Sequence, residues 1–123
     1  MSDKPVAERF QVKGDRRLAV VGASAALEKT VGANKARTEV VDADLVLLFA
    51  PNRATLDKAL PDLLKTMAPT SIFWVAYPKL SSKIAADLSR DVIHALAPQH
   101  GLDTVSQIAI DEDWSALRLK RVK

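Results

Sequence analysis

Two continuous apolar segments in the middle of the chain constrain its fold more than any other feature. The segments are Leu45–Ala50 and Ser71–Tyr77, and each has the length of a strand without any alternation of polar and apolar residues. A strand that is apolar on both faces is typical of a parallel sheet with helices on both sides. We therefore expect these two segments to lie side by side, parallel, in the centre of one sheet.

The sequence between these segments predicts an amphipathic helix. Asn52 is placed to cap its start, and Pro69 follows its end. Pro61 lies inside it, and a proline there either kinks a helix or begins a second one. The apolar residues recur at helical spacing and form one continuous face: Leu56, Leu60, Leu63, Leu64 and Met67. A strand, a helix and a parallel strand in this order predict a right-handed crossover.

The flanking segments extend this unit into an α/β domain. The further elements that we expect are a strand over 17–22, a helix over 25–31, a weaker strand over 37–41, a helix carrying Leu88 to Ala97, and strands over 102–110 and 116–122. The short segment between the last two strands indicates a hairpin. The sequence thus predicts a three-layer, Rossmann-like α/β domain with a mostly parallel sheet of about six strands that ends in an antiparallel hairpin. Residues 1–14 are expected to form an N-terminal arm, and residues 15–123 a single domain.

Composition and charge exclude several classes of function. The chain has no cysteine, so disulfides, thiolate chemistry and cysteine-bound zinc are excluded. No apolar run approaches the roughly 20 residues that cross a bilayer, and the first residues lack the apolar stretch of a secretory signal, so we expect a cytoplasmic protein without a membrane partner. The net charge of +3 is small, and Phe49, Phe73 and Trp74 fall in expected strands, which does not favour nucleic-acid binding.

The order of elements is similar to the class I methyltransferase fold, a Rossmann-like sheet that ends in an antiparallel strand. Asp44-Leu45-Val46 with the apolar run after it resembles the fourth strand of that fold. The helix that ends at Met67, followed by Pro69 and the strand Ser71–Tyr77, resembles its fourth helix and fifth strand. The resemblance covers about residues 17–122 and implies a truncated version of the fold, because the chain is too short to hold the middle strand and its helices.

A more specific resemblance lies in the second half of the chain. It rests on Trp74-Val75-Ala76-Tyr77-Pro78-Lys79, Ser81-Ser82, Asp87-Leu88, Arg90-Asp91, Ile110-Asp111-Glu112 and Trp114-Ser115-Ala116-Leu117-Arg118. In these motifs the chain resembles an uncharacterised bacterial family known only as domain of unknown function 3052. The resemblance implies a fold and no established activity.

The first predicted strand does not lead into a good cofactor site. Methyltransferase and dinucleotide sites have several glycines at this point, so that the backbone can approach the ligand. This chain has Gly22-Ala23-Ser24-Ala25-Ala26, and the alanine methyl groups would crowd an adenosyl or pyrophosphate group. Asp42 stands where an acidic ribose ligand could follow the second strand, although an aspartate there is usually a turn residue. We therefore predict no cofactor.

Ser24 has two further interpretations. Its position between a strand and a helix is close to a nucleophile elbow, with His94 or His100 as the base, but the second glycine of that motif is Ala26 here. The simpler interpretation is a helix cap, which serine favours.

Ligands of open parallel sheets bind beyond the carboxyl ends of the strands. The segments expected to converge there contain the candidate ligand-binding residues Ser24, Asn52, Lys79, Ser81, Ser82, Lys83, Arg90, Asp111 and Trp114. The cationic and hydroxyl donors among them suit a phosphate or a carboxylate. The alternative is that Lys79 and Lys83 are solvated and that Arg90 pairs with Asp87 or Asp91.

The three acids at 111–113 indicate a charged hairpin turn rather than a metal site, since no histidine is near in sequence. Trp114 is expected to anchor the core, with Asp111 as the partner of its indole N–H. No catalytic set is evident. The sequence therefore favours a non-catalytic domain that binds a small anionic ligand or a partner protein. The alternatives are a small-molecule enzyme related to the adenosylmethionine-dependent methyltransferases and, after it, a nucleic-acid binder.

Overall fold

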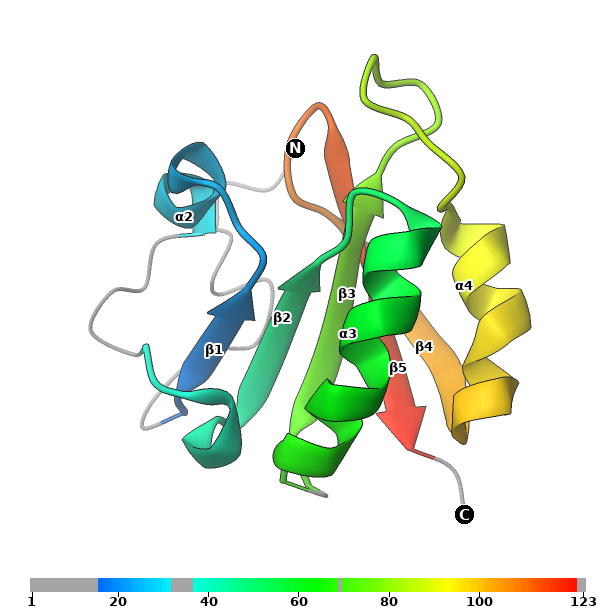
Figure 1. Ribbon diagram of the computed structural model, residues 1–123. Helices are drawn as coiled ribbons and strands as arrows, with labels where there is room; N and C mark the ends of the chain where they lie inside the picture. The colour runs from blue at the N-terminus through cyan, green and yellow to red at the C-terminus, as the bar shows by residue number, and fades with distance from the viewer. Residues whose placement is uncertain (1–15, 32–36, 69, 122–123) are drawn as a thin grey trace.

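The computed structural model describes residues 16–31, 37–68 and 70–121. Its strands are β1 (Leu18–Val21), β2 (Leu45–Phe49), β3 (Ile72–Pro78), β4 (Leu102–Ala109) and β5 (Trp114–Arg121). Its helices are α2 (Ala25–Val31), α3 (Arg53–Thr66) and α4 (Arg90–Leu96), with 3-10 turns η2 (Val40–Asp42) and η3 (Ala97–His100). Figure 1 shows the strands as one sheet, with α3 and α4 in front of it. The predicted arm, residues 1–14, lies outside the described residues.

The sheet is mixed. Its strand order is β1-β2-β3-β5-β4, in which β1, β2 and β3 are parallel and β5 is antiparallel to both of its neighbours. The two apolar segments are adjacent and parallel as predicted, with Leu45 opposite Ile72. The described residues form a mixed sheet of five strands, so the prediction of a mostly parallel sheet of about six strands is not confirmed. The final hairpin turns back into the sheet, and its second strand pairs with β3 instead of extending the edge.

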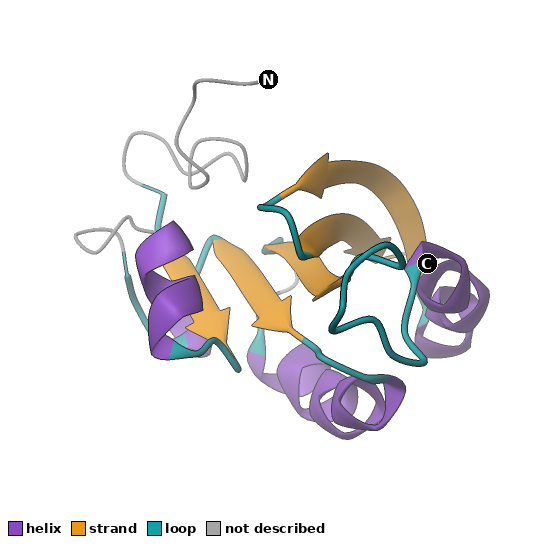
Figure 2. Cartoon of the chain, turned by 90° about the horizontal axis from the view of Figure 1, so that it is seen from above, coloured by secondary structure: helices purple, strands orange, loops and turns teal. Residues whose placement is uncertain are grey.

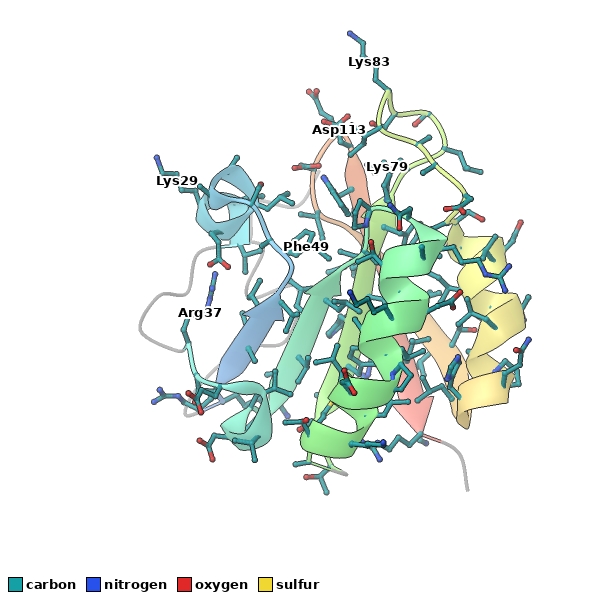
Figure 3. The ribbon with its side chains drawn as sticks, viewed as in Figure 1. Lys29, Arg37, Phe49, Lys79, Lys83 and Asp113 are labelled. Atoms are coloured by element: carbon teal, nitrogen blue, oxygen red, sulfur yellow. The ribbon has the colours of Figure 1, made fainter. Side chains whose placement is uncertain are left out.

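The strand predicted over 37–41 is wrong. Arg37 makes only an isolated bridge to Leu18, and the chain then turns into η2 at Val40. The β-branched residues of this segment favour a strand, but Val41 is largely exposed and buries no face against the sheet. The side chain of Arg37 instead forms an ion pair with Glu28 of α2, which holds the segment beside that helix (Figure 3).

Helices cover both faces of the sheet, as the apolar strands require. One core cluster joins α3 and α4 to the face that carries Val46, Val75 and Tyr77. The other joins α2 to the opposite face, which carries Leu47 and Trp74. Figure 2 looks down on the edge of the sheet and shows α2 on one side and α3 with α4 on the other. Because alternate residues of a strand face opposite sides of the sheet, Tyr77 lies on the same side as Val75, which is the side of α4.

Helix α3 runs without interruption through Pro61, so the proline neither ends it nor starts a second helix. The proline is exposed, on the side away from the buried face formed by Leu56, Leu60 and Leu63. Asn52 caps the helix, because its Oδ1 accepts from the backbone N–H of Thr55 at 2.8 Å. In the part of the chain that the structure describes, no helix has the length and apolarity to cross a bilayer.

Candidate functional site

The carboxyl ends of β1, β2 and β3 lie at one edge of the sheet, where Gly22, Pro51 and Lys79 follow them. The segment 79–88 rises from this edge as a long loop, with Lys83 at its tip (Figure 3). Two hollows flank the loop on opposite faces of the sheet. The first, here called the Tyr77 cleft, has a volume of about 540 Å³ and is lined by Tyr77, Lys79, Leu80, Ser81, Ser89, Arg90, Asp91, Gln107 and Ser115. The second, the Gly22 pocket, has about 440 Å³ and is lined by Gly22, Ser24, Ala26, Leu27, Thr30, Pro51, Ile84, Asp111, Asp113 and Trp114.

The predicted ligand-binding residues divide between these hollows. Lys79, Ser81 and Arg90 line the Tyr77 cleft. Ser24, Asp111 and Trp114 line the Gly22 pocket, on the other face. The remaining three, Asn52, Ser82 and Lys83, line neither hollow. The structure thus places most of the predicted residues at the expected edge without gathering them into one site.

The Gly22 pocket is built from residues with structural roles. Gly22 has a φ of 77°, and a Cβ there would stand 2.7 Å from the carbonyl oxygen of Phe49, so the glycine lets β1 end close against β2. Ser24 caps α2, as predicted, since its Oγ accepts from Leu27 N–H at 3.3 Å. Trp114 packs edge-on against Phe49, with ring centroids 5.2 Å apart.

Asp42 and the two histidines do not join Ser24. Asp42 lies in η2, before β2 begins, and therefore at the opposite edge of the sheet from Gly22, so it is not placed as a ribose ligand. His94 is on α4, on the other face of the sheet, where its Nδ1 is 2.7 Å from Thr104 Oγ1. His100 ends η3 at the edge where β4 begins. The nucleophile-elbow hypothesis is therefore wrong.

Two of the acids in the β4–β5 turn, Asp111 and Asp113, accept hydrogen bonds that hold the turn and the neighbouring loop in place. Asp111 Oδ1 accepts from the backbone N–H groups of Asp113 and Trp114, both at 2.9 Å, so its partner is the main chain and not the indole that we expected. Asp113 Oδ1 accepts from Ser82 Oγ at 2.7 Å. Within residues 16–31, 37–68 and 70–121, no three His, Asp or Glu side chains come together as a metal site.

The loop 79–88 is tied down at both ends. Its first residue, Lys79, donates its backbone N–H to Asp113 O at 2.8 Å, and Ser82 bonds the same aspartate. Near its end, Asp87 Oδ1 accepts from the backbone N–H of Arg53 at 2.8 Å, at the start of α3. The loop therefore has a defined path, although most of its side chains are exposed.

Arg90 pairs with neither of the acids predicted for it. Its Nη1 donates to Gln107 Oε1 on β4 at 3.4 Å, which is long for a hydrogen bond. Asp87 is occupied at the start of α3, and Asp91 forms no ion pair in the described structure. The guanidinium group consequently lies over the Tyr77 cleft with a weak neutral partner.

The floor of the cleft is polar and buried. Tyr77 is 4% exposed, and its register partner across β3 and β5, Ser115, is 5% exposed. The Tyr77 hydroxyl is buried and makes no well-formed hydrogen bond with the described residues, although the polar side chains of Gln107 and Ser115 lie near it. Burial raises the pKa of Tyr77, an effect partly offset by the positive charge of Arg90 and by the polar groups of Gln107 and Ser115. The phenol is therefore neutral at pH 7 and offers an O–H donor.

Tyr77, Gln107 and Ser115 line the cleft but are not among the residues predicted from the sequence. Tyr77 and Ser115 enter the sequence argument only in a predicted strand or in the family motifs. A tyrosine at the end of an apolar strand is a usable signal, because its hydroxyl needs a polar partner when the ring is buried. Chemically, the Tyr77 cleft combines hydroxyl and amide donors with two cations, Lys79 and Arg90, and one carboxylate, Asp91.

The solved structures most useful for comparison are methyltransferases. A ribosomal protein L11 methylase from Lactobacillus delbrueckii subsp. bulgaricus superposes with a TM-score of 0.61 at 13% identity, over 95% of this chain and 75% of the methylase. The mitomycin 7-O-methyltransferase MmcR gives 0.61 at 11%, over 96% and 53%. The glycopeptide N-methyltransferase MtfA complexed with sinefungin gives 0.59 at 8%, over 95% and 93%. At these identities the likeness confirms the methyltransferase-like fold and says nothing further about activity.

The comparison of sequences points to one family. No curated protein matches the chain. A family model described as "Protein of unknown function (DUF3052)" matches residues 21–123, which is most of the chain and includes the motifs quoted above. The chain therefore belongs to the DUF3052 family.

Proposed function

We propose that this protein is a non-catalytic domain that binds a small anionic ligand in the Tyr77 cleft. The observation that carries the proposal is the buried Tyr77 hydroxyl at the floor of a cleft beside Arg90, which makes no well-formed hydrogen bond with the described residues and has only the neutral side chains of Gln107 and Ser115 near it. Buried polar groups are nearly always hydrogen-bonded, so each exception calls for an explanation. A ligand oxygen would accept the proton of this hydroxyl.

The charge distribution supports an anion. Two cations and one carboxylate line the cleft, which leaves one positive charge in excess. Arg90 holds only the neutral oxygen of Gln107, at 3.4 Å. A carboxylate or phosphate would form shorter, charge-assisted bonds with the guanidinium group, and these are about twice as strong as neutral ones. A ligand anion is therefore expected to displace Gln107 from Arg90.

The second candidate function is binding of adenosylmethionine in the Gly22 pocket. The observation in its favour is the position of that pocket, which opens at the end of β1 and holds the carboxylates of Asp111 and Asp113. Against it, one oxygen of Asp111 is already occupied by two backbone N–H groups, and Asp113 is bonded to Ser82. These groups hold the turn and the loop in place, so we rank this function second.

A titration of the protein with inorganic phosphate, followed by NMR, tests the proposal. We expect Arg90→Ala to weaken binding by about 10-fold or more, since hydrogen bonds to charged groups contribute about 1.5–3 kcal/mol. Tyr77→Phe removes only the hydroxyl and should weaken binding by a smaller factor. Lys58→Ala is the matched control, because it removes one positive charge from the exposed side of α3, away from the cleft.

Three outcomes would overturn the proposal. Equal losses in Arg90→Ala and Lys58→Ala would show that only net charge matters. A rise in melting temperature with adenosylmethionine that Arg90→Ala leaves intact would favour the Gly22 pocket. If phosphate and adenosylmethionine both fail to bind, a partner protein becomes the better explanation of the exposed loop.

A further inference from the structure

The Tyr77 cleft is much larger than the anion that its polar floor would hold. Its volume is about 540 Å³, which lies in the range of roughly 300–1,000 Å³ typical of sites for organic molecules. A single water occupies about 30 Å³ in the liquid, and a bare phosphate or carboxylate is only a few times larger. An inorganic anion would therefore fill a small part of the cleft, and the remainder calls for a larger organic ligand.

The lining of the cleft also includes an exposed apolar side chain, that of Leu80. Leu80 is 73% exposed, the highest value among the exposed large apolar residues of the described chain. A single exposed leucine is common on protein surfaces and by itself indicates nothing. Leu80, however, lines the same cleft as the buried Tyr77 hydroxyl.

The position of Leu80 is fixed by the backbone on both sides of it. Lys79, immediately before it, is bonded to Asp113 O, and Ser82, two residues after it, is bonded to Asp113 Oδ1 and donates its own N–H to Lys79 O at 3.0 Å. These bonds close a tight turn with Leu80 near its start. The leucine is thus held at the rim of the cleft.

From this juxtaposition we propose that the ligand is an amphipathic anion: a phosphate or carboxylate that carries an apolar chain or ring, with the apolar part packed on Leu80. The inference rests on the proposed function. The anionic group binds Arg90 and the Tyr77 hydroxyl at the floor, and the apolar group covers the leucine at the rim. The polar and the apolar parts of the lining are then used by one molecule.

The alternative path for an apolar group is the groove between α4 and β4. This groove has a volume of about 240 Å³, shares Arg90 and Gln107 with the cleft, and contains Val105, which is 52% exposed. It is also lined by polar or charged side chains from both α4 and β4, among them Asp91 and His94. Leu80 is the more exposed of the two side chains and lines the larger hollow, so it is the favoured contact, and Val105 provides a matched control.

The test compares inorganic phosphate with a series of alkyl phosphates from methyl to hexyl, using NMR titration. Full burial of one methylene group raises affinity about fourfold, so burial of half of each group at an open rim should raise it about twofold. We expect the affinity to rise by about twofold per methylene over the first few members. Leu80→Ser should abolish most of this rise while leaving the affinity for inorganic phosphate within about twofold of wild type.

The control variants separate the possible failures. Val105→Ser should leave the chain-length dependence unchanged, as should Val41→Ser, which alters an exposed valine at the far edge of the sheet. If phosphate binds but its alkyl esters bind no better, or if Val105→Ser and not Leu80→Ser removes the rise, the inference about Leu80 is overturned and the anion site stands. If Arg90→Ala does not weaken phosphate binding, the proposed function itself has failed.

Discussion

Replacement of Gly22 by alanine should destabilise the protein far more than an ordinary glycine substitution. The φ of 77° costs an L-residue about 1–2 kcal/mol. The added Cβ would also meet the carbonyl oxygen of Phe49 at 2.7 Å, and relief requires the end of β1 to move away from β2. Overpacking of this kind costs about 1–3 kcal/mol. Alanine also makes the unfolded chain stiffer, which offsets about 0.4–1 kcal/mol and leaves a net loss of about 1–4.6 kcal/mol.

Thermal and urea unfolding followed by circular dichroism would measure this loss. For a domain of this length 1 kcal/mol corresponds to about 3–5 °C, so the melting temperature should fall by roughly 3–23 °C. Gly101→Ala is the control, since Gly101 has a nearly equal φ of 71° at the end of η3; only the backbone cost less the same unfolded-state gain, about 0–1.6 kcal/mol, is expected there. If the two variants lose the same stability, the contact with Phe49 is not the reason for glycine at position 22. Close approach of a ligand to the backbone would then be the better explanation of this glycine.

Three further predictions concern the cap, the loop and the buried phenol. Asn52→Ala should lower the free energy of unfolding by about 0.5–2 kcal/mol, whereas Asn52→Asp should retain most of it, and equal losses in urea melts would contradict the capping role. Ser82 Oγ accepts a hydrogen bond from the Ile84 N–H at 3.2 Å, so Ser82→Ala should speed the hydrogen exchange of this amide with little change in melting temperature. Unchanged exchange would show that other contacts hold the loop. Burial raises the pKa of Tyr77 above its ordinary value of 10.0 in the folded state, so the unfolded chain ionises first. The contribution of Tyr77 to the free energy of unfolding is therefore fully present below pH 10 and is lost as the pH rises above it. Tyr77→Phe should lack this pH-dependent loss of stability. If urea melts at pH 8 and 10.5 show equal losses in the wild type and the variant, the effect does not come from Tyr77.

The central layer of the fold was predictable because its signals are local. Segments such as Leu45–Ala50, apolar on both faces, have few alternatives to a buried strand, and Asn52 with the apolar stripe behind it defines α3. The pairing of the last hairpin was not predictable in the same way. Periodicity predicts strands over 102–110 and 116–122, but the choice of neighbour for β5 depends on contacts between residues some forty positions apart, such as Val75 with Leu117. The prediction for 37–41 failed because strand propensity alone does not decide the structure: Val40 packs against the core from a 3-10 turn, and Val41 is largely exposed.

The candidate site was predictable as an edge and not as a set of residues. Parallel strands end together, so Gly22, Lys79 and their neighbours had to meet at one edge. The two hollows at this edge, however, lie on opposite faces of the sheet. Successive residues of a strand alternate between the faces, so Tyr77 shares a face with Val75, and Trp74 lies on the other. The second half of the polar floor could not be inferred, because Ser115 reaches Tyr77 only through the antiparallel pairing of β3 with β5.

The same edge of the sheet contains two hollows of similar size, and they differ in which polar groups are already used. At the end of β1, Gly22 is needed for the approach of two strands, Ser24 caps α2 and Asp111 holds a turn. At the end of β3, the Tyr77 hydroxyl makes no well-formed hydrogen bond with the described residues, and Arg90 forms only a long one. Groups that already stabilise the fold bind a ligand only at the expense of stability, whereas groups without strong partners gain from it. A fold shared with methyltransferases is therefore compatible with a ligand that binds beside a different strand.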